Sequence, residues 1–341
     1  MRLAAYFVRG SDAQAIHVPL GIMIAIVYSR HYDISFFGIE RLHPFDSRKY
    51  GRAWRELRKQ LGSNASKYLV TVDRPATFGE LLQVHTAGYL ISIRQSKALA
   101  AALELPPLRR LPSWLLRWRV LRPMRWAVRG TVLAAKTALE RGVAVNMSGG
   151  YHHAKPNRGE GFCVYSDIAL AVQQLRLEGR IRGSQRIAYV DCDAHQGNGV
   201  CHQFLHDKVF FIFDMFNEEI YPVYDVAARQ RIDCRLPVPS RCTGTEYLSI
   251  LRKSLPGFLD SISRAQPVAL GIYNAGTDVF VGDQLGGMCL TADDVLERDL
   301  FVAEQFRERE IPMVMLLSGG YSKMSYQLIA NSVRQLIERY A

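Results

Sequence analysis

Seven short apolar runs, separated by longer stretches with helical periodicity, constrain the fold of this 341-residue chain more than any other feature. Because the runs are apolar throughout, they are typical of strands buried on both faces of a sheet. Their alternation with helices predicts the α/β class, with one open parallel sheet and helices on both faces. The expected strands are residues 24–28, 68–72, 143–147, 187–191, 209–213, 268–273 and 313–317, and the clearest helical stretches are 130–141, 166–179, 244–261 and 291–309.

No linker, low-complexity tract or internal repeat divides the sequence, so residues 1–341 are predicted to form a single domain. The six cysteines include no Cys-x-x-Cys pair, which favours neither a disulfide framework nor a thiolate zinc finger. The first residues contain too short an apolar stretch for a secretory signal, and no apolar run is long enough to span a bilayer. A cytoplasmic location is expected, since the cytosol is reducing.

The formal net charge of +11 favours an acidic partner, such as nucleic acid or an anionic lipid surface, over a basic tail. Much of this charge lies in residues 108–129, where arginines alternate with Trp, Leu and Met. A basic, Trp-rich amphipathic segment can lie at a membrane interface. Most amphipathic helices instead cover a core, and Pro112 and Pro123 interrupt this one, so the preferred prediction is one or two surface helices that bury their Trp face. No specific nucleic-acid partner is expected.

Polar, Gly-rich segments follow four of the predicted strands. Asp191, Asp193 and His195 end the run that begins at Ile187, and alternate positions of an extended chain put all three on one side. The other three segments are residues 146–153, 274–278 and 318–321. Because the carboxyl ends of parallel strands share one edge of a sheet, the four groups are predicted to converge on one site.

The residue types at this edge point to a metal. Asp193, His195 and Asp278 supply two carboxylates and one imidazole, a ligand set that zinc accepts while keeping a position open for water. His152 and His153 are alternative ligands, but adjacent side chains diverge, and a histidine beside a bound water is better placed as an acid or base. The candidates to accept a hydrogen bond from each imidazole are Asp191 and Asn198.

The ordered set of motifs resembles the zinc-dependent histone deacetylases, and most closely their small, single-domain class IV branch. The resemblance runs from about Val27 to Tyr321, nearly the whole chain. Each motif alone is a modest signal, whereas the ordered set is highly specific. The motifs are residues 43–46, 84–89, 149–154, 161–163, 191–199, 220–222, 273–278, 282–283, 286–287 and 318–321.

The resemblance implies an activity and its residues. One catalytic Zn²⁺ would be bound by Asp193, His195 and Asp278, and structural K⁺ would lie near Asp191, Asp193 and His195. His152 and His153 would be the acid/base pair, backed by Asp191 and Asn198. Tyr321 would donate to the developing oxyanion, and Gly319-Gly320 would permit the turn that directs its phenol toward the metal.

The resemblance also places the substrate, an acyl-lysine protein or peptide. Phe162 is expected to form one wall of the acyl-lysine tunnel, the Gly161 carbonyl to meet the substrate amide, and Gly150, with Gly149, to shape the floor beneath the metal. The second aromatic wall is expected from residues 216–221, where either Phe216 or Tyr221 is a candidate. His43 and Lys49 are expected to line the inner pocket or its exit route. The alternative is that they belong to a polar loop anchored by Pro44.

The class IV resemblance favours a lysine deacylase acting on long, fatty acyl chains in preference to acetyl. Many members carry Asp where this chain has Asn198, so His153 should be the weaker base. No acidic residue can be assigned to the tunnel rim. Arginase, with two manganese ions, is disfavoured because Gly197 and Phe280 stand where its second set of carboxylates would be. The alternatives are an acetylpolyamine or other small-molecule amidohydrolase and, in another class, a non-catalytic acyl-lysine binding module.

Overall fold

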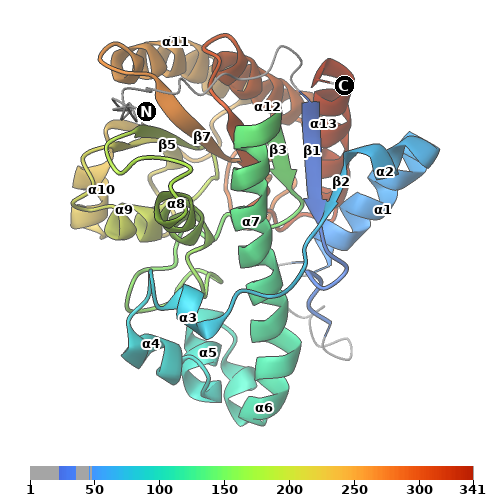
Figure 1. Cartoon of the computed structure of the whole chain (residues 1–341), viewed down its shortest axis with the longest axis vertical. Coiled ribbons are helices and arrows are strands. Elements are labelled where there is room, and N and C mark those ends of the chain that lie inside the picture. Colours follow the sequence, from blue (N-terminus) through green and yellow to red (C-terminus); the bar gives the residue numbers. More distant parts are fainter. Residues whose placement is uncertain (1–22, 36–45, 47, 341) are drawn as a thin grey trace, which may run out of the picture.

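The computed structural model describes residues 23–35, 46 and 48–340, and in this part of the chain eight strands form one all-parallel sheet (Figure 1). Their order is β2-β1-β3-β8-β7-β4-β5-β6. The predicted parallel α/β architecture is therefore confirmed. The strands are β1 (Met23–Tyr28), β2 (Leu69–Thr71), β3 (Gly142–Asn146), β4 (Arg186–Asp191), β5 (Phe210–Asn217), β6 (Cys234–Val238), β7 (Val268–Asn274) and β8 (Met313–Leu316).

Helices cover both faces of the sheet. The helix α7 (Arg122–Arg141) packs on β1 and β3 and against α8 (Asp167–Leu177). Over the other face α1 (Lys49–Leu61), α13 (Ser325–Tyr340), α12 (Ala292–Arg307) and α11 (Gly244–Ser263) pack in succession. The short helices are α2 (Ala65–Tyr68), α3 (Phe78–Leu81), α4 (Ala87–Ser92), α5 (Ser96–Ala102), α6 (Ser113–Leu116), α9 (Asn198–Gln203) and α10 (Val226–Arg231).

The sheet order explains where a site can form. The strands β3, β8, β7 and β4 are neighbours, and these are the four strands whose carboxyl ends carry the polar segments. Central residues of these strands are fully buried, which fits runs without polar alternation. The helices α3 to α6 lie beyond the carboxyl-terminal edge of the sheet (Figure 1). The four polar segments therefore converge, as predicted.

The Trp-rich segment differs from its prediction. Residues 113–141 are continuously helical, because a π-helical segment, Arg117–Leu121, joins α6 to α7. Pro123 comes directly after the π-helical segment, whose wider turn interrupts the regular i to i−4 hydrogen bonds, and it does not end the helix. The side chain of Trp126 is buried, whereas Trp114 and Trp118 are 62% and 48% exposed. The expectation of a buried Trp face is wrong for two of its three tryptophans.

In the part of the chain that the structure describes, no helix combines the length and the apolar character needed to cross a membrane.

Candidate active site

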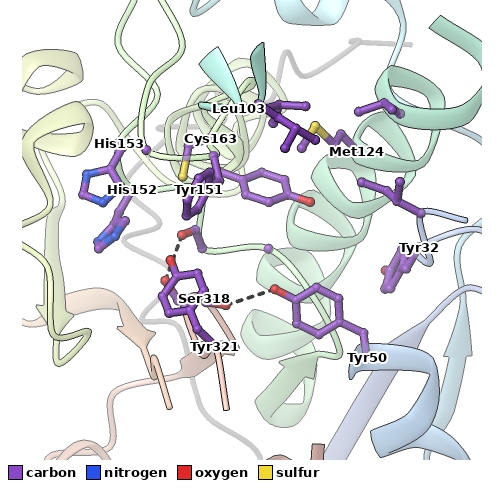
Figure 2. A pocket seen from close by; sticks show the side chains of 18 of the residues that line it. Tyr32, Tyr50, Leu103, Met124, Tyr151, His152, His153, Cys163, Ser318 and Tyr321 are labelled. Carbon is purple, nitrogen blue, oxygen red and sulfur yellow. Dashed lines mark hydrogen bonds between the residues drawn. The ribbon is translucent and has the colours of Figure 1, made fainter. Parts of the chain in front are cut away.

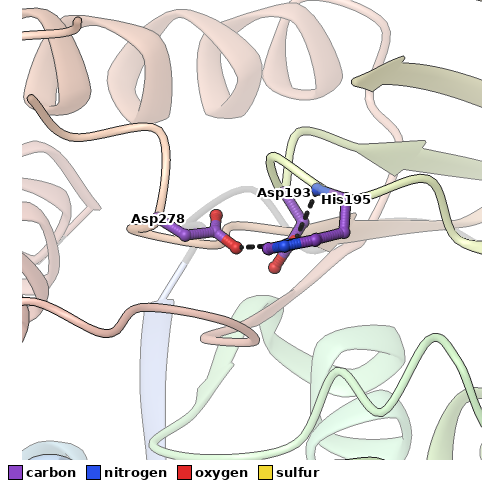
Figure 3. Close-up of side chains that lie close together, drawn as sticks. All are labelled: Asp193, His195 and Asp278. Atoms are coloured by element: carbon purple, nitrogen blue, oxygen red, sulfur yellow. Dashed lines mark hydrogen bonds and ion pairs between the residues drawn. The ribbon is translucent and has the colours of Figure 1, made fainter. Parts of the chain in front are cut away.

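Three buried side chains meet beyond the ends of β4 and β7 (Figure 3). They are Asp193, His195 and Asp278, and their candidate ligand atoms all lie within 4.8 Å of one another. The Nδ1 atom of His195 is 3.0 Å from Asp278 Oδ2 and 3.2 Å from Asp193 Oδ1. The set predicted from sequence is thus brought together from two separate segments.

The electrostatics of this cluster fit a cation. Burial, together with the charge of Asp193, raises the pKa of Asp278 to about 7. Burial by itself lowers the pKa of His195, but the hydrogen bonds and charges of both carboxylates outweigh it and raise that pKa to about 10. Two buried carboxylates therefore compete for a positive partner, and a divalent ion bound by an imidazole nitrogen and carboxylate oxygens would satisfy both.

The imidazoles of His152 and His153 lie side by side, with ring centroids 4.1 Å apart. Each has its own acceptor: His152 Nδ1 is 2.8 Å from Asp191 Oδ2, and His153 Nδ1 is 2.8 Å from Asn198 Oδ1. An amide oxygen only accepts, so Nδ1 of His153 carries the proton and its Nε2 is left basic. The predicted pairing of each ring with one acceptor is present.

The two imidazoles differ in charge. Burial lowers the pKa of His152, but the charges of Asp191 and Asp193 outweigh it and raise the pKa to about 9. Burial and the neighbouring His152 and His195 hold the pKa of His153 well below its usual range. The two imidazoles therefore differ in proton affinity, His152 holding a proton more strongly than His153, as an acid/base pair requires.

Other buried and partly buried groups hold these acceptors in place, and sequence reasoning did not assign them. The Tyr189 hydroxyl donates to Asp191 Oδ2 at 2.6 Å. The side-chain amide of Asn198 donates to Glu160 Oε1 at 2.6 Å, and Lys155 Nζ binds both Glu160 (2.8 Å) and Asp225 (2.6 Å). These partners are up to 70 residues apart, so only the fold joins them.

Tyr321 is buried beside the cluster. Its ring meets that of His195 edge-on, with centroids 6.0 Å apart, and its backbone N–H donates to Asp283. Burial, with the charges of Asp193 and Asp278, raises the pKa of Tyr321 well above its usual range, so the hydroxyl stays protonated and can donate.

Glycine is required in the turn that precedes Tyr321. A Cβ on Gly319 would lie 2.4 Å from Asp278 Oδ2, and Gly320 has a φ of +134°. The buried Lys49 ammonium donates to the carbonyls of Ser318 (2.8 Å) and Gly320 (3.3 Å), and burial lowers its pKa to about 8. Lys49, expected in the inner pocket or its exit route, thus supports the Tyr321 turn.

A largely apolar pocket leads away from the two imidazoles (Figure 2). Its polar end is lined by His152, His153 and Tyr321, and Leu103 and Met124 lie at its far side. Tyr50, which sequence reasoning missed, lines it and donates to the Ser318 carbonyl at 3.0 Å. The aliphatic lining residues are Ile34, Leu103, Leu105, Leu108, Val120 and Met124.

The predicted tunnel residues also lie here. Phe162 meets Tyr321 edge-on at 5.8 Å between centroids, and Gly161 and Gly150 line the pocket. Tyr221 meets the His153 ring at 5.1 Å and is 39% exposed, whereas Phe216 is fully buried in β5. The geometry therefore favours Tyr221 over Phe216 as the second aromatic wall. His43 lies outside the described residues.

Comparison with known proteins identifies the family. A model of the histone deacetylase domain matches residues 43–337. The chain is 44% identical to histone deacetylase 2 of Arabidopsis thaliana over 319 residues, which cover 94% of this chain and 80% of the relative. The chain belongs to the histone deacetylase family. It is also 30% identical to human histone deacetylase 1, over 53% of this chain and 36% of that protein.

Solved histone deacetylase structures share the fold. The HDA15 HD domain aligns with a TM-score of 0.72 at 17% identity, covering 92% of this chain and 88% of that one. A homologue of the family complexed with SAHA aligns with a TM-score of 0.69 at 22% identity, covering 93% and 84%. The family and its fold, both predicted from sequence, are confirmed, and the chain is a hydrolase of the histone deacetylase type.

Proposed function

We propose that this histone deacetylase family member is a zinc-dependent lysine deacylase of the class IV type, which prefers long-chain acyl groups to acetyl. The apolar extension of the pocket carries the preference. An acetyl group would occupy only the end beside His152, His153 and Tyr321, and would leave the aliphatic wall at Leu108 and Val120 without a partner. Each methylene buried there would contribute about 0.8 kcal/mol.

Asp193, His195 and Asp278 would hold the zinc. When bound, Zn²⁺ polarises the amide carbonyl and acidifies a water. The two buried carboxylates compete for a positive partner, and this supports the assignment.

The remaining steps fall to the chain's own side chains. The neutral His153 accepts a proton at Nε2, and the protonated His152 beside Asp191 supplies one to the lysine amine that leaves. Asn198, a neutral partner, leaves His153 a weaker base than a carboxylate would. Tyr321 donates its hydroxyl proton in a hydrogen bond to the developing oxyanion.

The substrate would be an acyl-lysine in a protein or peptide. Phe162 and Tyr221 would flank the lysine methylenes, the Gly161 carbonyl would accept from the substrate amide, and Gly150 would form the floor. A Cβ on Gly161 would lie 2.4 Å from the His153 ring, so the backbone there is held directly against the imidazole. A cytoplasmic location remains a prediction.

Structural K⁺ is proposed near Asp191, Asp193 and His195. Asp214 supports this, because it pairs with Asp191 in the register of β4 and β5 and is fully buried. Burial and the charge of Asp191 raise the pKa of Asp214 well above its usual range, and its Oδ1 has no hydrogen-bond partner among the described residues. A monovalent cation would compensate the negative charge of the buried Asp191 and Asp214 carboxylates.

A profile of rates against acyl-lysine peptides from acetyl to myristoyl tests the preference. We expect kcat/KM to rise with chain length in the zinc-loaded enzyme. Val120→Trp fills part of the apolar pocket, so it should remove the increase in kcat/KM for long acyl chains. Turnover of the acetyl peptide should persist in this variant and serves as the internal control. Met124→Phe should reduce the increase more mildly. A flat or falling profile would contradict the preference, and turnover of acetylpolyamines alone would favour the small-molecule alternative.

Tyr321→Phe tests the chemistry in the same assay. Turnover should fall roughly a hundredfold at every chain length, with zinc content unchanged. Near-normal activity in this variant would remove the tyrosine from the mechanism.

A further inference from the structure

The helical segment from α6 to the start of α7 has two unlike sides. Its inner side is buried, with Leu116, Val120 and Leu121 no more than 4% exposed. Its outer side, here called the Trp/Arg face, carries exposed tryptophans and arginines. The face consists of Trp114, Arg117, Trp118 and Arg122 of this segment, together with the exposed Arg109 and Arg110 of the 3-10 turn that precedes it.

Among the described residues, no acidic side chain pairs with the arginines of this face. No Asp or Glu occurs between residues 105 and 139. Two later arginines of the same run serve the fold: Arg129 pairs with Asp73 and Glu80, and Arg125 donates to the Ala76 carbonyl. The four arginines of the Trp/Arg face make no ion pair within the described part of the chain. They are therefore available to an external anion.

The two tryptophans give the face a second property. Trp114 and Trp118 lie one helical turn apart and are 62% and 48% exposed, whereas Trp54 and Trp126 are 5% and 8% exposed. Neighbouring exposed apolar side chains rimmed by charged ones are typical of interaction sites. Indole rings flanked by cations match the boundary between lipid headgroups and acyl chains.

We propose that the Trp/Arg face binds the surface of an anionic phospholipid bilayer. Phosphate attraction alone would fit a nucleic acid equally well, but paired exposed tryptophans next to the cations favour a lipid interface. Binding would be peripheral. The face lies at the end of the molecule beyond the carboxyl edge of the sheet, opposite α11 (Figure 1). If the proposed function holds, docking would bring the wall of the acyl pocket near the membrane, because Val120 lines that pocket from the same helical segment.

Vesicle co-sedimentation tests this proposal with the full chain. We expect binding to phosphatidylcholine vesicles that contain about one third phosphatidylserine, and little binding to phosphatidylcholine alone. Binding should weaken as salt rises. Arg117→Glu with Arg122→Glu should weaken it about 25-fold or more, at about fivefold for each cation lost. Arg117→Lys with Arg122→Lys should retain it, and Trp114→Ala with Trp118→Ala should weaken it several-fold.

A matched control pair removes an exposed apolar residue and reverses an exposed cation elsewhere. Leu177→Ala on α8 with Lys253→Glu on α11 should leave vesicle binding unchanged. Turnover of a soluble acyl-lysine peptide, measured separately, should be unchanged in the Trp/Arg face variants, so a failure of docking is distinguishable from a failure of the proposed function.

Three results would overturn the proposal. The first is equal binding of the wild type to neutral and anionic vesicles. The second is a loss of vesicle binding in the control pair as large as that in the Trp/Arg face variants. The third is that the face variants lose binding to a single-stranded oligonucleotide while they keep binding to anionic vesicles. The last result would assign the face to nucleic acid.

Discussion

His85 shows how a single buried side chain makes stability depend on pH. The residue is 4% exposed, and its Nε2 accepts the Ser166 backbone N–H at 2.9 Å. The other nitrogen, Nδ1, therefore carries the hydrogen and donates to the Lys155 carbonyl at 3.1 Å. Both neighbours suit the neutral imidazole, and burial lowers its pKa from 6.5 to about 4. His85 ties the loop before α4 to the segment that follows His153.

The sign of the pH dependence follows from this lowered pKa. Above pH 6.5 the His85 imidazole is neutral in both the folded and the unfolded chain, so its contribution to the unfolding free energy is complete. As the pH falls from 6.5 to about 4, only the unfolded chain binds a proton at His85, and the folded state loses stability. Between about pH 7 and about pH 5, wild type should lose about 2 kcal/mol more unfolding free energy than His85→Gln, which cannot titrate. Urea unfolding across this range measures it. Parallel curves for the two proteins would contradict the assignment.

At the scale of helices and strands, the local sequence pattern predicted the elements whose position depends on local hydrophobicity. The seven expected strands all overlap observed ones. Six of them lie inside the parallel sheet, where strands are apolar almost throughout, and the seventh, β2, is a short apolar run at its edge. The eighth strand, β6, was not expected. It lies at the edge beside β5, contains Pro237 and alternates exposed with half-buried residues, so its sequence does not resemble a central strand. The helical stretch expected at 130–141 extends back through Arg122 to Ser113, because the chain stays helical through a π-helical segment just before Pro123.

Helix α12 begins at a capping box that the sequence encodes. The Thr291 hydroxyl accepts the Asp294 backbone N–H at 3.2 Å, and Asp294 Oδ2 accepts the Thr291 N–H at 2.8 Å. Thr291→Ala should lower the unfolding free energy by about 1 kcal/mol, because one backbone donor loses its acceptor. Thr291→Ser, which keeps the hydroxyl, should cost less than half of that. Equal losses in both variants by chemical denaturation would show that the methyl group, and not the cap, matters.

For the whole molecule, topology made the site partly predictable. Four neighbouring parallel strands end in polar segments, so the convergence of Asp193, His195 and Asp278 follows from strand order and needs no side-chain detail. Contacts between loops could not be predicted in this way. The link from Asn198 through Glu160 and Lys155 to Asp225, and the support of the Tyr321 turn by Lys49, depend on how connections pack after the sheet has formed.

The proposed metal centre couples the site to the stability of the whole chain. Asp193 and Asp278 are no more than 1% exposed and lie side by side, an arrangement that costs free energy unless a cation compensates it. A ligand that binds only the folded state at a hundredfold excess over its Kd stabilises that state by about 3 kcal/mol. Zinc should therefore raise the melting temperature by several degrees, and a chelator should reverse the shift.

Asp278→Ala provides the matched comparison for this thermal shift. Without one of the two carboxylates the site should lose its zinc, so elemental analysis should find about one ion per chain in wild type and none in the variant. The variant's melting temperature should no longer respond to zinc. An equal thermal shift in both proteins would place the ion elsewhere, and two ions per wild-type chain would contradict a mononuclear centre. Because the measurement needs no substrate, it tests the metal site independently of acyl preference.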